Sequence, residues 1–177
     1  MKITDVRTAV IAGNFDWILV RVYTDEGLIG LGEAYWGAGV EDLIHAAKRL
    51  IIGENPFNIA RIYEKMIRGL SGAGSLAGAT VTAISGIEIA LWDLVGRALE
   101  TPIYNLFGGQ FRDKIRVYAD CHCGDEGTPE SDAEKARRVV AAGFTALKFD
   151  LDIPNPYTRD ISDDPDPRRW WYEPYNR

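Results

Sequence analysis

The stretch that decides the fold runs from Ala79 to Gln110 and reads ATVTAISGIEIALWDLVGRALETPIYNLFGGQ. Asp93 and Arg97 form an i,i+4 pair on one helical face, and the apolar residues recur at helical spacing on another. Pro102 cannot continue a helix, and a glycine turn closes the segment. The pattern predicts one long core helix followed by a short connector. The apolar positions are Ile84, Ile87, Leu91, Leu94, Val95 and Ala98.

The opening forty residues are typical of a three-stranded antiparallel meander. Asp25-Glu26-Gly27 supplies a tight turn, because glycine accepts the positive φ that a hairpin needs. Gly30 and Gly32 would let another backbone or a ligand approach the third strand closely. The predicted strands are Ile3–Ile11, Trp17–Thr24 and Leu28–Tyr35.

Two amphipathic helices are predicted between the meander and the long helix. The apolar stripe of the first runs from Leu43 to Ile51. The second would open at Asn55-Pro56, with asparagine as N-cap and proline in the first turn, and continue to Ile67. The segment from Gly69 to Gly78 is rich in glycine and predicts a loop.

The pattern changes beyond Lys114 to strand, helix, strand. We predict a strand at Ile115–Asp120, a helix capped by Thr128 that ends at Gly143, and a strand at Phe144–Asp152. Such a unit is a right-handed parallel crossover. Two parallel strands alone would leave an apolar face and an edge uncovered, so the unit needs partners.

Small Ala and Ser residues ahead of IALWDLVGR, with the PIYNLFGG turn behind it, resemble the enolase superfamily. The closer resemblance is to its mandelate racemase/muconate lactonizing enzyme-like branch, of the acid-sugar dehydratase type. It implies an α+β capping domain over residues 1–112 and, over 113–177, the first βαβ portion of a (β/α) TIM-type barrel ending in a long loop. A barrel needs roughly 250 residues, so we expect the barrel to be incomplete in this chain.

The resemblance also implies a reaction. A base removes the proton alpha to a carboxylate, and Mg²⁺ stabilises the resulting enediolate. Such a lyase (a hydro-lyase) would convert an aldonate or aldarate into a 2-keto-3-deoxy acid. The family's metal ligands stand on later barrel strands, so we expect them beyond Arg177 and assign no metal ligand here. This segment alone is expected to be inactive.

Strand parity gives the sharpest prediction about single residues. Lys148 and Asp150 alternate with apolar residues, so in a barrel they would point inward near the active-site rim. From the pattern alone, a lysine–aspartate pair on a solvated strand face is the more common arrangement. The resemblance implies that Lys148 matches the first lysine of a Lys-x-Lys motif, which contacts the substrate carboxylate. Asp150 replaces the second lysine, which favours a dehydratase over a two-base racemase.

Further substrate-binding candidates lie at a strand end and in a cap loop. Asp120 and His122 share one face at the end of the predicted Ile115–Asp120 strand. The imidazole could bind a hydroxyl, although a lone histidine is more often structural. The resemblance implies that the loop holding Asn14 and Phe15 contacts the far end of a polyhydroxy acid.

Composition limits the remaining function classes. The formal charge of −6 argues against nonspecific nucleic-acid binding. No apolar run approaches the roughly 18 residues of a membrane span, and the N-terminus lacks a signal-like apolar region. We expect a cytoplasmic protein with a sugar-acid substrate and no nucleic-acid or membrane partner. A homo-oligomer and the remainder of the barrel are the expected protein partners.

Three alternatives stay open from the sequence. Two are enzymes of the same superfamily: a racemase or epimerase, and a cycloisomerase. The third is a non-catalytic interaction module that retains the cap. A lysine base opposite Lys148 in further sequence would favour either of these two enzymes over the dehydratase.

Overall fold

The computed structural model describes residues 1–12, 16–70, 72, 77–121 and 128–149. The chain divides into two compact units, and the division falls between Gln110 and Phe111.

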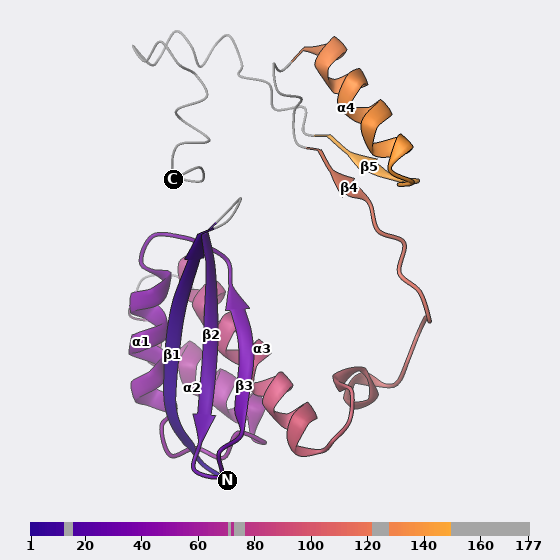
Figure 1. Ribbon diagram of the computed structural model, residues 1–177. Coiled ribbons are helices and arrows are strands. Elements are labelled where there is room, and N and C mark those ends of the chain that lie inside the picture. The colour runs from indigo at the N-terminus through magenta and orange to yellow at the C-terminus, as the bar shows by residue number, and fades with distance from the viewer. Residues whose placement is uncertain (13–15, 71, 73–76, 122–127, 150–177) are drawn as a thin grey trace, which may run out of the picture. The chain divides into compact units, whose positions relative to one another are not determined.

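The first unit contains a three-stranded antiparallel sheet in the order β1-β2-β3 (Figure 1). The strands are β1 (Ile3–Ala12), β2 (Asp16–Thr24) and β3 (Ile29–Ala34). Gly27 in the β2–β3 turn has a φ of 81°, the left-handed conformation that glycine adopts without strain. The predicted meander and its turn are therefore confirmed.

Helices lie on one face of this sheet (Figure 1). They are α1 (Val40–Ile51), α2 (Ile59–Leu70) and α3 (Ala79–Ala98), followed by the short 3₁₀ helix η2 (Ile103–Phe107). The predicted start of α2 is wrong. The Asn55 side-chain oxygen accepts a hydrogen bond from the Phe57 N–H at 3.0 Å, so Asn55 stabilises a turn before the helix.

The core of this unit lies between the sheet and the helices. From the sheet it takes the alternate residues Ile18, Val20 and Val22, each at most 2% exposed. By length and hydropathy alone, α3 could cross a membrane. Most of its apolar side chains are instead buried in this core, as in the central helix of a globular domain.

The backbone of α3 packs directly on β3 through glycines. A β-carbon at Gly30 would overlap the Ala90 carbonyl oxygen and lie 2.7 Å from the Leu94 β-carbon. One at Gly32 would overlap the Gly86 carbonyl oxygen and lie 2.7 Å from the Ala90 nitrogen. The predicted close approach at Gly30 and Gly32 is confirmed, and the approaching backbone is that of α3.

The second unit is a short strand–helix–strand motif. β4 (Ala119–Asp120) and β5 (Leu147–Lys148) pair in parallel, and α4 (Pro129–Ala141) connects them. Thr128 caps α4 as predicted, through reciprocal hydrogen bonds with Ser131 at 3.2 Å. Residues 115–118 do not pair, so β4 is shorter than predicted, as expected of a parallel ladder with only two strands. Residues 150–152 of the second predicted strand lie outside the described residues.

The close contact between α3 and β3 predicts that one added methyl group on β3 strongly destabilises the fold. Gly32→Ala should destabilise the chain by about 2 kcal/mol or more, because neither backbone can move away without opening the core. Urea unfolding followed by circular dichroism would measure this change. Gly72→Ala is the matched control, since no described heavy atom lies within 4 Å of its β-carbon position. Equal unfolding midpoints for the two variants would contradict the packing.

One ion cluster links β1 to α1. The Asp5 carboxylate contacts the Lys48 ammonium on α1 and accepts a hydrogen bond from Arg7 Nε at 2.7 Å. These contacts lower the pKa of Asp5 to about 2, the Lys48 hydrogen bond first and the Arg7 hydrogen bond second. Because the folded-state pKa is below the usual value of about 4, this stabilisation is complete above pH ~4 and is lost as the pH falls toward ~2.

This order of causes can be tested by NMR titration of the Asp5 carboxyl. Lys48→Met should raise its pKa, and Arg7→Met should raise it by less, because the Lys48 contact contributes more. A larger rise of the Asp5 pKa in Arg7→Met than in Lys48→Met would contradict this order. It would show that the Lys48 contact between β1 and α1 lowers the Asp5 pKa less than the Arg7 contact does.

Candidate active site

Two neighbouring parallel strands bring a lysine and an aspartate together. Asp120 on β4 stands directly opposite Lys148 on β5 in the parallel register. The backbone hydrogen bonds Ala119 N to Ala146 O, 3.0 Å, and Cys121 N to Lys148 O, 2.9 Å, hold this register. Opposed residues of a ladder project to the same side of the sheet, so the two side chains share a face.

The two charged groups are in contact. Lys148 Nζ donates to Asp120 Oδ2 at 2.8 Å, and the side chains are 47% and 38% exposed. An ion pair so exposed contributes little to stability. Its importance is geometric, because it fixes an ammonium beside a carboxylate at the carboxyl ends of two parallel strands. In a barrel this is the end that carries catalytic groups.

Adjacent Cys121 confirms the alternation at the end of β4. Its side chain is only 1% exposed, whereas that of Asp120 is 38% exposed. The Lys148–Asp120 pair thus projects from the face of the ladder opposite to the buried Cys121 side chain.

Sequence reasoning named both residues but did not pair them. It placed Lys148 beside Asp150 on the same strand and assigned Asp120 to sugar binding. The register between β4 and β5 brings Asp120 to Lys148, and no periodicity along a single strand carries that information. The other predicted site residues, Asn14, Phe15, His122 and Asp150, lie outside the described residues, so their roles stay predictions.

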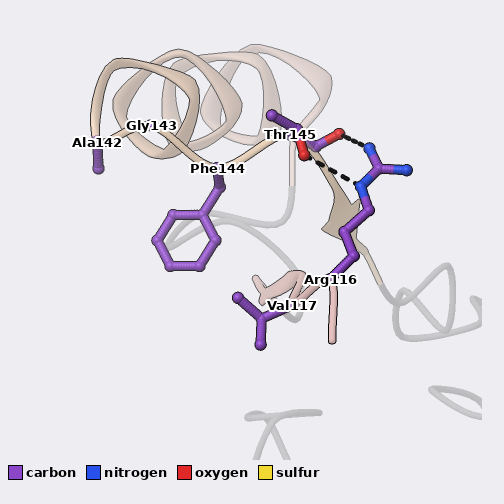
Figure 2. Close-up of a pocket in the computed structure, with 6 residues that line it drawn as sticks. All are labelled: Arg116, Val117, Ala142, Gly143, Phe144 and Thr145. Carbon is purple, nitrogen blue, oxygen red and sulfur yellow. Dashed lines mark hydrogen bonds between the residues drawn. The ribbon is translucent and has the colours of Figure 1, made fainter. Parts of the chain in front are cut away.

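A separate shallow pocket lies at the opposite, amino-terminal edge of the two strands (Figure 2). Its apolar lining includes Val117 and Phe144. Arg116 reaches across to Thr145, donating from Nε to the hydroxyl oxygen at 3.0 Å and from Nη2 to the backbone carbonyl (Figure 2). These polar groups bind each other, and this end of a barrel serves stability rather than chemistry. We therefore place the candidate site at Lys148.

Magnesium does not fit the part of the chain that the structure describes. No group of three or more His, Cys, Asp or Glu residues comes together there. A magnesium site needs several hard oxygen ligands in octahedral geometry. Asp120 alone, already bound to an ammonium, does not supply them.

Comparison with known proteins agrees with this architecture. Residues 5–108 match the profile described as mandelate racemase / muconate lactonizing enzyme, N-terminal domain. The chain is 51% identical over 160 residues to D-xylonate dehydratase of Haloferax volcanii, a match covering 90% of this chain and 39% of that enzyme. It is 41% identical over 137 residues to D-gluconate dehydratase of Thermoproteus tenax, covering 75% of this chain and 27% of that enzyme.

A solved structure shares the fold. The mandelate racemase/muconate lactonizing enzyme-like protein from Rubrobacter xylanophilus matches with a TM-score of 0.79 and 40% identity, over 88% of this chain and 43% of that one. This chain therefore spans less than half the length of each of these relatives. The family match covers more than half of the chain, and the capping fold agrees with it. The chain belongs to the mandelate racemase/muconate lactonizing enzyme family of the enolase superfamily, and residues 5–108 form its N-terminal domain.

Proposed function

We propose that this chain is the N-terminal part of an acid-sugar dehydratase, a hydro-lyase acting on an aldonate. The complete enzyme would remove the α-proton and the β-hydroxyl group of the substrate as water. The enol that remains would tautomerise to a 2-keto-3-deoxy acid. The identity to D-xylonate dehydratase over 90% of the chain supports this reaction class, and the Lys148–Asp120 pair is the observation that carries the mechanism.

Lys148 would bind the substrate carboxylate. An ammonium group has three N–H donors. One is directed to Asp120, and we propose that the ammonium also donates to an anionic substrate oxygen placed over the carboxyl ends of the strands. Ionic hydrogen bonds of this kind are stronger than neutral ones and would help to orient the acid. Binding the carboxylate to a cation also favours loss of the α-proton, because negative charge moves onto the carboxylate oxygens.

Asp120 would hold the Lys148 ammonium in position. A lysine side chain is a flexible four-carbon stem, and without a fixed partner its ammonium would sample many rotamers. The parallel register places the Asp120 carboxylate within hydrogen-bond distance of it. We propose that Asp120 acts through Lys148. His122 would bind a sugar hydroxyl, and Asn14 and Phe15 would contact the far end of the acid.

The proposal also covers Asp150, at the second position of the lysine motif, and the metal. Asp150 stands where a two-base racemase of this family would have a lysine, so a one-sided proton abstraction followed by loss of hydroxide is favoured. The ligands of Mg²⁺ are expected beyond Arg177, and none is assigned to a residue of this chain. We assign no step of the reaction to the ion here.

The reaction class can be tested in a chimera. The matching segment of the Haloferax volcanii D-xylonate dehydratase is replaced by the corresponding residues of this chain, and formation of a 2-keto-3-deoxy acid is measured with D-xylonate, D-gluconate and D-galactonate. Turnover of at least one aldonate is expected, because the cap and first strands supply carboxylate and sugar contacts. A chimera that folds by circular dichroism and turns over none of them would contradict the proposal.

The same chimera tests the roles of Lys148 and Asp120. Lys148→Gln should lower kcat/KM by about 10²-fold or more, because a neutral amide loses the ionic contact to the substrate carboxylate. Asp120→Asn should lower it by about 10-fold, since the ammonium remains but is held less firmly. Lys114→Gln changes an exposed lysine of the same unit and should leave kcat/KM unchanged. Equal rates for the Lys148 and Lys114 variants would show that Lys148 has only a structural role.

A further inference from the structure

The Lys148–Asp120 contact depends on a short ladder. In the part of the chain that the structure describes, β4 and β5 pair at two positions, Ala119 with Leu147 and Asp120 with Lys148. A slip of one residue would turn Lys148 to the face opposite Asp120, because side chains alternate along a strand. Two short strands specify their register weakly by themselves, so contacts outside the ladder help to select the observed pairing.

One such contact lies just before the two strands. Arg116 precedes β4, and Thr145 precedes β5. The guanidinium donates from Nε to the Thr145 hydroxyl oxygen at 3.0 Å and from Nη2 to the Thr145 backbone carbonyl oxygen (Figure 2). Both hydrogen bonds therefore converge on one residue. Because a guanidinium holds its N–H donors in a fixed planar fork, two bonds to one residue define its position closely.

The Thr145 hydroxyl makes this contact specific to one register. The residues on either side of it are Phe144 and Ala146, and neither has a side-chain hydrogen-bond acceptor. The next residues outward, Gly143 and Leu147, also lack one. A slip of β5 in either direction would bring one of these opposite the guanidinium in place of Thr145. The carbonyl contact could form again there, but the hydroxyl contact could not.

The end of α4 fixes the position of Thr145. The Gly143 N–H donates to the Val140 carbonyl oxygen at 2.9 Å, and the Phe144 N–H donates to the Val139 carbonyl oxygen at 3.3 Å. These are the two bonds of a Schellman motif, and Gly143 has a φ of 93°, in the left-handed region that the motif uses. The motif sets the direction in which the chain leaves α4, so Thr145 follows it in a defined position.

We propose that Arg116 is a positioning residue for the candidate site. Its two hydrogen bonds to Thr145 select the register of β4 and β5, and this register places the Asp120 carboxylate against the Lys148 ammonium. Arg116 lies at the amino-terminal edge of the strands, so it would act on the reaction only through the register. The importance of the register for catalysis rests on the function proposed above, whereas its selection by Arg116 does not.

Amide hydrogen exchange and cross-strand NOEs test the selection of the register in the 177-residue chain. Arg116→Met keeps the aliphatic stem and removes both donors. The ladder N–H groups of Ala119 and Cys121 should then exchange about 10-fold faster, and cross-strand NOEs should report more than one register. Thr145→Val should have a smaller effect, because it removes the hydroxyl and keeps the carbonyl. Thr145→Ser keeps both and should behave as the wild type does.

Arg137→Met is the matched control in the same unit. Arg137 is an exposed arginine of α4 that donates from Nη1 to Glu134 Oε2 at 3.0 Å, and its loss should leave exchange in the ladder unchanged. A single register with unchanged exchange in Arg116→Met would overturn the proposal. An equally large effect of Arg137→Met would do the same, as would unprotected Ala119 and Cys121 amides in the wild-type chain.

The chimera with the Haloferax volcanii enzyme tests the link to the reaction. Arg116→Met should lower kcat/KM by about 5-fold, and Arg137→Met should leave it unchanged. In a Lys148→Gln background Arg116→Met should cause no further loss, because it acts only through the position of the Lys148 ammonium. A substitution that merely destabilised the fold would lower kcat/KM by the same factor in both backgrounds, and that result would overturn the positioning role.

The two experiments fail separately. A folded parent chimera that turns over no aldonate contradicts the proposed function, and hydrogen exchange and NOEs in the 177-residue chain then decide the role of Arg116 by themselves.

Discussion

The direct contact between the backbones of β3 and α3 is the constraint on which the capping unit depends. Gly30 and Gly32 on the strand and Gly86 on the helix leave no room for a β-carbon. The helix therefore lies closer to the sheet than side chains would permit. Its apolar residues reach the inner face of the sheet on one side and the helices α1 and α2 on the other. One long helix thus connects all layers of the unit.

Much of this unit could be predicted from its sequence, because the signals are local. Strand alternation and the glycine turn at Gly27 gave the meander, and helical periodicity gave α3. The small residues of β3 indicated a close approach but not its partner, since the contact joins residues about sixty positions apart. The prediction at Asn55 was wrong for a different reason. Its side chain is suited both to a helix N-cap and to a turn, and the turn before Ile59 forms instead.

The candidate site could be predicted only in part. The parity of one strand identified Lys148, and the end of another identified Asp120. Their contact depends on the register between β4 and β5, which is set by hydrogen bonds between distant segments.

The most direct measurement is a crystal structure of a complete enzyme that contains this segment, with an aldonate bound. The proposed function predicts that the Lys148 ammonium lies within hydrogen-bond distance of the substrate carboxylate while still contacting Asp120. A structure in which Lys148 points outward toward the surrounding helices, away from the bound acid, would contradict it.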